Sequence, residues 1–247
     1  MSQHTVLITG ANGGIGQVLC ASFLEADWKV IATDKDDSNA SMADIYLSLD
    51  LKRLCNDSLY KGEKISQLQT YIGKTGLHAL IHNAATQILA PVEKLTSDDW
   101  HDTMDTNLIA PFLLSQSLLP DLQKVKGSII NIASIHARLT KPNFAAYATS
   151  KAALIGLTRS LAVELGDRIQ VNAICPAAIA TPMLKQGFEN NPLGLEQLAE
   201  FHPSGCIGTP EEVTQAVRYL AENKISFLNG AIIGLDGGMA SRLHDPG

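Results

Sequence analysis

The sequence predicts an α/β protein in which a doubly wound parallel sheet is covered by helices on both faces. Short apolar runs, from residues 5–9 to residues 227–236, alternate with segments in which apolar residues recur at helical spacing. Such alternation is typical of parallel sheets that bind ligands at the carboxyl ends of their strands. The chain has 247 residues and no abrupt change of composition, so we expect a single domain spanning residues 1–247.

Composition and charge narrow the possible functions. With 45% hydrophobic and 18% charged residues, the sequence is typical of a soluble globular protein, and its apolar runs end before membrane-spanning length. The N-terminus leads into an apolar strand without the regions of a signal peptide, so we expect a cytoplasmic protein. The formal net charge of -6 comes without a basic stripe, which argues against nucleic acid and membrane surfaces and favours small-molecule partners.

The cysteines and histidines do not form a recognisable metal or disulfide pattern. The 4 cysteines stand singly along the chain, so we expect reduced structural thiols. His78 and His82 have the spacing of a helical metal pair, but on a strand they would lie about 13 Å apart. The sequence therefore predicts no metal site.

A glycine-rich turn from Gly10 to Gly16 follows the first predicted strand, residues 5–9, and leads into a helix. Glycines let the backbone approach a pyrophosphate closely, and the helix N-terminus offers free N–H groups to the anion. By itself this turn is explained equally well as a tight connection. The next strand supplies the second half of a dinucleotide site.

The second predicted strand, residues 29–33, ends at Asp34, 18 residues after Gly16. A carboxylate at this position accepts both ribose hydroxyls of an adenosine and repels a 2′-phosphate. No basic residue stands inside the glycine turn, and we interpret Lys35 as a single solvated charge. NAD is therefore favoured over NADP. The plainer interpretation of Asp34 is a solvated loop acid, since strand ends often carry aspartate.

The alternation continues through the middle of the chain. A third strand is predicted at residues 45–49, a helix-containing connection at 54–76 and a fourth strand at 78–81, which leads into Asn83 and Ala84. Small residues after this strand indicate backbone close to a ligand.

A long helix is predicted to begin at Thr96 or Ser97, either of which can cap its N-terminus. Pro111 should kink this helix just after Asn107. Asn107 is polar in the middle of the helix, so it either bends the helix or serves a site. The predicted buried face consists of Trp100, Met104, Leu108 and Phe112.

The second half of the chain repeats the pattern with one interruption. Strands are predicted at residues 127–132, 169–174 and 227–236, and helices at 147–165 and 210–220. Residues 177–208 lack clear periodicity. We predict an inserted substrate loop there, because long loops in compact domains often act as lids.

Tyr147 and Lys151 open the helix predicted at 147–165, and Ser134 follows the fifth strand. Residues four apart share one helix face, so the phenol and the ammonium can meet over one site. A phenol, with an ordinary pKa near 10, is about three units too weak an acid at neutral pH. A cation at roughly 4 Å, with an effective dielectric constant near 20, contributes about 4 kcal/mol, or about three units. The pair is therefore predicted to be a proton-transfer device.

Together these motifs resemble the short-chain dehydrogenase/reductase family, and the resemblance covers nearly the whole chain. In chain order the motifs are Thr9 to Gly16, Asp50-Leu51, Asn83-Ala84, Asn107, Ser134, Tyr147 with Lys151, and Asp236 to Gly238. The resemblance implies a Rossmann-type sheet of about seven strands flanked by helices. It also implies hydride transfer between NAD(H) and a secondary alcohol or ketone, in a homotetramer or dimer.

The resemblance implies roles for individual residues. Tyr147 would be the acid/base, and Ser134 would contact the substrate oxygen. Lys151 would hold the nicotinamide ribose, and Asn107 would anchor a water that relays protons. The residues expected to bind the cofactor are Gly10, Asn12, Gly13, Gly14, Ile15, Gly16, Asp34, Asp50, Leu51, Asn83, Ala84, Tyr147, Lys151, Pro176, Ile179 and Thr181.

Departures from the family pattern at His82, Ala85, Ala110 and Ala177 leave the shape of the substrate pocket open. A cyclic polyol, a sugar derivative, a steroid or a short hydroxy acid would each fit. Two other functions also stay open: a 3-oxoacyl-carrier-type reductase, which would usually prefer NADPH, and a non-catalytic dinucleotide-binding sensor or scaffold. The side chains expected to line or cover the pocket are Gln87, His136, Arg138, Phe144, Ala178, Met183, Phe188 and Phe201.

Overall fold

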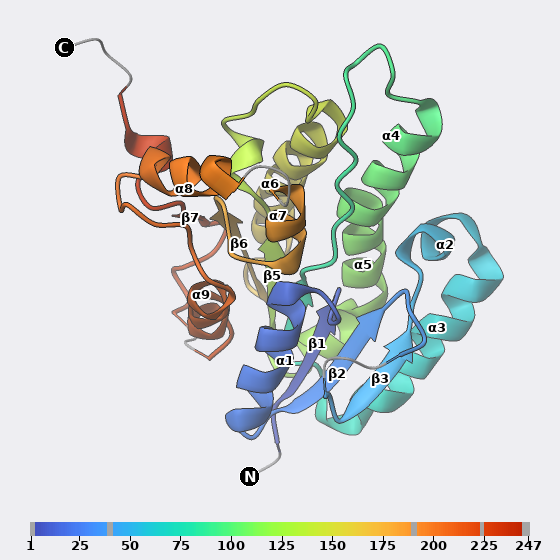
Figure 1. Ribbon diagram of the computed structural model, residues 1–247. Helices are drawn as coiled ribbons and strands as arrows, with labels where there is room; N and C mark the ends of the chain where they lie inside the picture. Colours follow the sequence, from blue (N-terminus) through green and yellow to red (C-terminus); the bar gives the residue numbers. More distant parts are fainter. Residues whose placement is uncertain (1–2, 39–41, 189–191, 223–224, 244–247) are drawn as a thin grey trace.

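The computed structural model describes residues 3–38, 42–188, 192–222 and 225–243. Seven parallel strands form one sheet in the order β3-β2-β1-β4-β5-β6-β7 (Figure 1), which confirms the predicted doubly wound parallel sheet. The strands are β1 (Thr5–Thr9), β2 (Lys29–Asp34), β3 (Ile45–Ser48), β4 (Ala79–His82), β5 (Ser128–Ile132), β6 (Gln170–Pro176) and β7 (Ile232–Leu235). Within the described residues, every helix is too short or too polar to cross a membrane.

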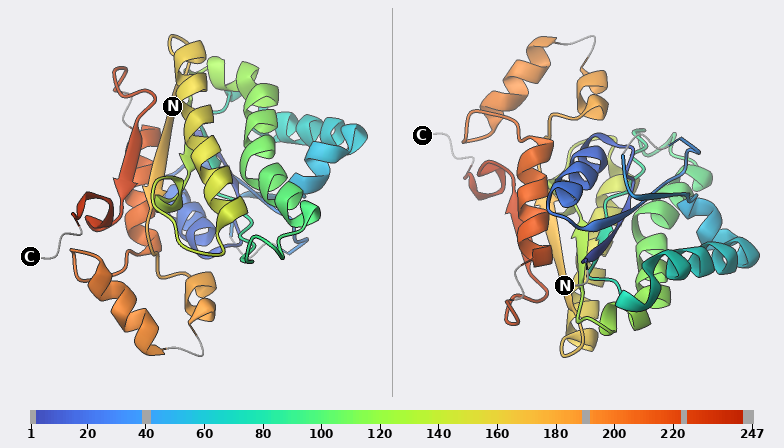
Figure 2. Two further views of the ribbon diagram at one scale, coloured as in Figure 1. Left: turned by 90° about the horizontal axis from the view of Figure 1, so that it is seen from above. Right: turned by 90° about the horizontal axis from the view of Figure 1, so that it is seen from below.

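Helices cover both faces of the sheet, as the views from above and below show (Figure 2). Side chains alternate along a strand, so Val6 and Ile8 enter one apolar cluster and Leu7 enters the other. The first cluster is closed by α1 (Gly14–Glu25) and α9 (Pro210–Glu222). The second is closed by α3 (Ser58–Ile72), α5 (Ala110–Gln123) and α6 (Ala145–Leu165).

The parallel register brings the carboxyl ends of the strands to one edge of the sheet. Thr9 pairs with Thr33, His82 with Asn131, and Ile132 with Ile174. The segments that follow these strand ends carry the predicted motifs. Residues from distant parts of the sequence therefore meet at this edge.

The segment 177–208, predicted to be a loop, contains two helices. These are α7 (Pro182–Gly187) and α8 (Pro192–Phe201), while residues 189–191 lie outside the described part of the chain. Thr181 caps α7 by accepting a hydrogen bond at Oγ1 from the Leu184 amide at 3.3 Å, and Pro182 occupies the first turn. Both helices are too short to show the periodicity of a long buried helix, which explains the wrong prediction.

The predicted connection at 54–76 consists of helix α2 (Leu51–Asn56), helix α3 and a 3-10 turn, η1 (Gly73–Thr75). The predicted last strand at 227–236 is shortened to β7. Side chains also hold the residues before β7, since Asn229 Oδ1 accepts from the Val171 amide at 2.8 Å and Asn172 Nδ2 donates to Leu228 O at 3.0 Å. Backbone bonds to β6 add to them, because the Gly230 amide donates to Val171 O at 2.8 Å and the Ala173 amide donates to Ala231 O at 2.9 Å.

The long central helix is interrupted rather than continuous. It comprises α4 (Ser97–Met104), a π-helical turn, η2 (Asp105–Ile109), and α5. Thr96 is its cap, and a reciprocal hydrogen-bond pair with Asp99 forms a capping box. The irregularity predicted at Pro111 takes the form of this wider turn, in which the Ala110 amide donates to Asp105 O.

The predicted buried face of this helix was wrong. Trp100 is 37% exposed and Phe112 is 39% exposed, whereas Thr103 and Asn107 are buried. The π turn adds a residue to the helix, so positions that would align on a regular helix no longer share a face. The apolar residues therefore lie partly on the surface.

Candidate active site

A cavity of about 920 Å³ lies along the carboxyl edge of the sheet. Its walls come from the glycine turn, the ends of β2, β4, β5 and β6, the start of α2 and α6, and helices α7 and α8. The predicted site residues that line it are Gly10, Asn12, Gly13, Gly14, Ile15, Asp34, Asp50, Leu51, Asn83, Ala84, Ser134, Tyr147, Lys151, Pro176, Ile179 and Thr181. The predicted residues Gly16 and Asn107 do not line it.

The glycine turn is fixed by its neighbours across the sheet. Gly10 has φ +66°, and a Cβ on it would stand 2.6 Å from Ala84 Cα, so only glycine fits there. Asn83 Nδ2 donates to Thr9 O at 3.1 Å and to Gly10 O at 2.9 Å. Thr9 Oγ1 accepts from the amides of Asn83 and Ala84 at 3.1 Å each. This role of the Thr9 hydroxyl was missed in the sequence, because it depends on a strand some seventy residues away.

The N-terminus of α1 faces the cavity, since Gly13, Gly14 and Ile15 line it. Gly13 is the N-cap and provides no side-chain cap, and the first turn contains no acidic residue. A Cβ on Gly16 would collide with Gly10 O, so this glycine serves the close packing of helix against turn and not the cavity wall. An anion such as a pyrophosphate fits this end of the helix.

Asp34 stands beside the turn with both carboxylate oxygens hydrogen-bonded. Oδ2 accepts from the Asn12 amide at 2.9 Å, and Oδ1 accepts from the Lys35 amide at 2.8 Å. Each oxygen keeps a second lone pair, so ribose hydroxyls can still be accepted. Behind this carboxylate, Asn12 Nδ2 donates to the Tyr46 hydroxyl at 3.0 Å and to Ser38 O at 2.8 Å. These residues fit the adenosine half of a dinucleotide.

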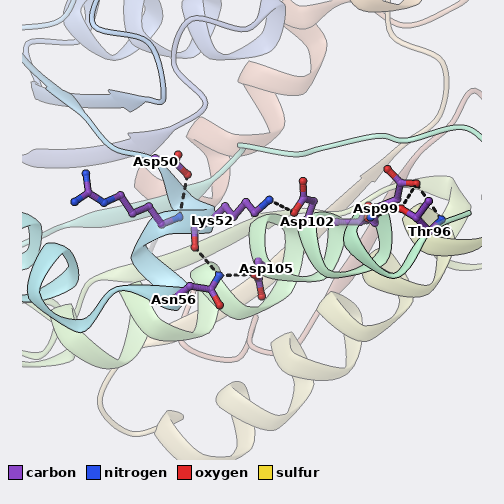
Figure 3. A network of polar contacts seen from close by, with 9 residues as sticks. Asp50, Lys52, Asn56, Thr96, Asp99, Asp102 and Asp105 are labelled. Atoms are coloured by element: carbon purple, nitrogen blue, oxygen red, sulfur yellow. Dashed lines mark hydrogen bonds and ion pairs between the residues drawn. The ribbon is translucent and has the colours of Figure 1, made fainter.

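The start of α2 forms the next wall and is tied to the central helix (Figure 3). Asp50 caps α2, since its Oδ1 accepts from the Arg53 amide at 3.0 Å. Lys52 forms an ion pair with Asp102 of α4. Asn56 Nδ2 donates to Asp105 Oδ2 at 2.7 Å, at the first residue of the π turn (Figure 3).

Ser134, Tyr147 and Lys151 converge in the middle of the cavity. The side chains of Tyr147 and Ser134 are hydrogen-bonded, and Ser134 Oγ also accepts from the His136 amide at 3.2 Å. Lys151 Nζ donates to Ile132 O at 2.7 Å and lies 5.7 Å from the centroid of the Tyr147 ring. Both side chains line the same cavity.

The pKa of Tyr147 differs from the expectation that the nearby Lys151 cation would lower it. Burial raises the pKa of Tyr147, and the hydrogen bond with Ser134 lowers that pKa only in part. Burial lowers the pKa of Lys151 to about 8, with a smaller opposing effect of Cys175. Loss of solvation is therefore the largest cause of both pKa shifts, and it disfavours the charged form of each group.

Asn107 is fully occupied inside the protein. Its Oδ1 accepts from the Thr86 amide at 2.8 Å, and its Nδ2 donates to Thr86 O at 2.9 Å and to Ser150 Oγ at 3.0 Å. Ser150 Oγ in turn donates to Tyr147 O at 2.7 Å. Asn107 therefore connects the π turn to the helix that carries Tyr147.

The wall beyond Tyr147 is largely apolar. His136 stacks on Phe144 with ring centroids 4.1 Å apart, and burial, with a smaller effect of Lys141, lowers the pKa of His136 to about 4. All of the predicted pocket residues line the cavity except Arg138. Further residues that line the cavity carry no motif or periodicity that would have predicted this role; they include Leu89, Leu139, Thr140, Lys141, Leu184, Leu198, His202 and Met239.

His78 and His82, which have the spacing of a helical metal pair, both make contacts inside the protein. His78 Nδ1 accepts from the Thr5 amide at 3.1 Å, and His82 Nε2 contacts Ser115 Oγ at 3.0 Å. Burial lowers the pKa of His82 to about 3. Across the described residues, no group of three or more His, Cys, Asp or Glu has metal-binding geometry.

A parallel sheet with a glycine turn, a carboxylate beside that turn and a Ser–Tyr–Lys cluster at one edge is typical of dinucleotide-dependent oxidoreductases. Residues 10–240 match the family model described as enoyl-(acyl carrier protein) reductase. The chain is 35% identical to an uncharacterized oxidoreductase of Schizosaccharomyces pombe, over 96% of this chain and 90% of that relative. It belongs to the short-chain dehydrogenase/reductase family.

Two solved structures support the same assignment. A 4-hydroxyisoleucine dehydrogenase complexed with NADH superposes with a TM-score of 0.88 at 31% identity, over 98% of this chain and 100% of that chain. ElxO with NADP bound superposes with a TM-score of 0.87 at 27% identity, over 98% and 100%. The neighbours thus use nicotinamide dinucleotides of both kinds.

Proposed function

We propose that this protein transfers a hydride between NAD(H) and a secondary alcohol or ketone, with Tyr147 as the acid/base. The observation that carries the proposal is the convergence of Ser134, Tyr147 and Lys151 in one cavity with the glycine turn and Asp34. The family membership supports an oxidoreductase, and the geometry of this cluster supports chemistry on an oxygen-bearing carbon.

The bound nicotinamide supplies the hydride acceptor or donor. In ketone reduction, the phenol of Tyr147 gives its proton to the substrate oxygen, while Ser134 holds that oxygen by a hydrogen bond. In alcohol oxidation the hydroxyl proton passes to Tyr147, which must first be ionised. Because burial raises the pKa of Tyr147, oxidation should accelerate as the pH rises and reduction should slow.

Asp34 is the residue on which the choice of NAD rests. Its oxygens remain able to accept ribose hydroxyls, and its charge opposes a 2′-phosphate. Asp36 lies in the same wall and adds a second negative charge. Lys35 is exposed there and is the nearest compensating cation in the sequence.

The test is a screen of secondary alcohols with NAD and NADP, and of the matching ketones with NADH and NADPH. We expect turnover with NAD, and we expect Tyr147→Phe to reduce it by about a thousandfold while NADH binding, followed by fluorescence, stays within twofold. Retained turnover in Tyr147→Phe would contradict the role of the phenol. A tenfold preference for NADP, equivalent to only about 1.4 kcal/mol, would contradict the role of Asp34.

A carrier-linked reductase is the second candidate, and the description of the matched family model favours it. A carrier-linked reductase would reduce 3-oxoacyl or enoyl thioesters with NADPH in preference to free ketones with NADH. The absence of turnover with every substrate, combined with tight NADH binding, would instead point to a dinucleotide-binding sensor or scaffold.

We also propose that the chain forms a homo-oligomer. Apolar side chains are exposed on adjoining helices, including Trp100 of α4, Phe112 of α5 and Val163 of α6. Burial of these side chains against a second copy would remove them from water.

A further inference from the structure

His202, directly after α8, combines burial with an unused hydrogen-bonding atom. Its side chain lines the cavity, yet the residue is only 2% exposed. His202 Nδ1 lies 2.8 Å from Leu198 O, and a carbonyl only accepts, so Nδ1 carries the hydrogen. In the neutral ring Nε2 is then an acceptor, and within the described residues it has no hydrogen-bond partner. A buried acceptor left unpaired costs about 1–3 kcal/mol.

The surrounding backbone holds His202 in this position. The Gly205 amide donates to His202 O at 2.8 Å, and the Ser204 amide donates to Gly237 O at 3.0 Å. A Cβ on Gly237, whose φ is +58°, would stand 3.3 Å from His202 Cβ. The C-terminal glycine turn thus packs directly against this residue, and the imidazole belongs to a fixed wall and not to a free loop.

The chemistry around His202 indicates which group would satisfy Nε2. The neighbouring lining residues Leu198, Phe201 and Met239 are apolar. The acidic residues that line the cavity, Asp34, Asp36 and Asp50, belong to its adenosine end. From the cavity side, a cationic donor would therefore meet no lining carboxylate beside His202 among the described residues, whereas a neutral hydroxyl needs only the acceptor.

We infer that His202 Nε2 accepts a hydrogen bond from a second hydroxyl of the substrate. The inference rests on the proposed function, and it selects secondary alcohols that carry a further hydroxyl, such as cyclic or open-chain polyols, over simple mono-alcohols. Nε2 is shielded from solvent, so binding requires the side chains that cover it to shift. The reacting hydroxyl meets Ser134 and Tyr147, and the second one meets His202.

A shallower hollow adjoins the other side of His202 and is lined by Glu200 and Arg242. A donor from that side would satisfy the same atom without any part in substrate recognition. The experiment must therefore compare substrates that differ only in the second hydroxyl.

The experiment uses matched pairs, cyclohexanol with the cyclohexanediols and 2-pentanol with the pentanediols. Turnover with NAD and calorimetric binding to the NADH-loaded protein are both measured. We expect kcat/KM or affinity at least tenfold higher for the best diol than for its mono-alcohol. His202→Phe, which keeps a planar ring, should abolish this ratio and leave the mono-alcohol within threefold. His202→Gln, which returns an acceptor oxygen, should restore part of the ratio.

His101→Phe is the matched control, because His101 is exposed on α4 and lies outside the cavity lining. It should leave the ratio unchanged. A diol-to-mono-alcohol ratio near one in the parent protein, or an unchanged ratio in His202→Phe, would overturn the inference. Failure of every alcohol to be oxidised, with diols still bound tenfold more tightly than mono-alcohols, would overturn the proposed function and leave His202 as a recognition residue.

Discussion

Lys151 illustrates how burial controls the chemistry of single residues in this site. The side chain is 2% exposed, and its ammonium donates to Ile132 O at 2.7 Å. Burial lowers the pKa of Lys151 to about 8, and Tyr147 beside it has its pKa raised by the same cause. Both shifts disfavour charge. The side chain of Lys151 therefore stays protonated below about pH 8, and this buried charge lowers the folding stability.

Replacement of Lys151 by Met should make this cost visible. The folded pKa of about 8 lies below the ordinary value of 10.5, so the folded state binds fewer protons between these values and stability rises with pH there. At pH 7 the buried ammonium lowers the free energy of unfolding by its full amount, about 3 kcal/mol. Lys151→Met removes this destabilisation but also loses one hydrogen bond, which contributes about 1 kcal/mol. We expect Lys151→Met to melt several degrees higher at pH 7.

Thermal unfolding followed from pH 7 to pH 10 is the measurement. The parent protein should gain stability across this range relative to Lys151→Met, so that the difference between their melting temperatures shrinks. Turnover should be lost in the variant at every pH. A constant difference across the range would contradict a buried, strained ammonium.

The π turn η2 connects two working parts of the molecule at the scale of elements. On one side, Asp105 accepts from Asn56 of α2, whose first residue Leu51 lines the cavity. On the other side, Asn107 holds Thr86, which lines the cavity, and Ser150, which lies next to the lining residue Lys151. On a regular α-helix the side chains of Asp105 and Asn107 would point in different directions relative to each other. The irregular turn thus aligns both ends of the site.

Asn107→Ala should destabilise the protein by about 2–3 kcal/mol, because the Thr86 backbone groups and the Ser150 hydroxyl all lose their buried partner. Asn56→Ala is the matched control. Asn56 is exposed on the neighbouring helix, so its loss should cost less than about 1 kcal/mol. Urea unfolding of both variants checks the prediction. Equal midpoints would contradict it, because the buried amide of Asn107 would then stabilise the protein no more than the exposed amide of Asn56.

At the scale of the whole molecule, exposed apolar side chains gather on helices α4, α5 and α6, which is typical of a surface that contacts another protein chain. Phe112 is 39% exposed, and Val163 is also exposed. The π turn lies between two exposed side chains of this surface, Trp100 of α4 and Phe112 of α5. The irregular turn that contains Asn107 therefore belongs to the helices of the candidate contact between copies.

Phe112→Glu should lower the mass of the particle in solution. A carboxylate at the centre of an apolar contact loses its hydration without gaining a partner, which typically costs several kcal/mol. Multi-angle light scattering after gel filtration measures the mass. Leu59→Glu is the control, because Leu59 is exposed on α3, which is not one of the three helices of this surface. A monomeric parent protein, or an unchanged mass in Phe112→Glu, would contradict the proposed oligomer.

The sequence by itself determined the strands, the glycine turn and the carboxyl-edge positions of Asp34, Ser134 and Tyr147. These features follow from hydrophobic periodicity and turn chemistry, which depend on residues close together in the chain. Parallel pairing then brings every strand end to one edge, so motif positions along the chain predict much of the site.

Tertiary structure alone decided which atoms are satisfied and which are not. The bonds of Asn107 to Thr86 and Ser150 join segments distant in sequence. The burial of His202 Nε2 without a partner among the described residues likewise depends on what packs around it. The raised pKa of Tyr147 belongs with them, because desolvation depends on everything packed around a group and not on its nearest charge.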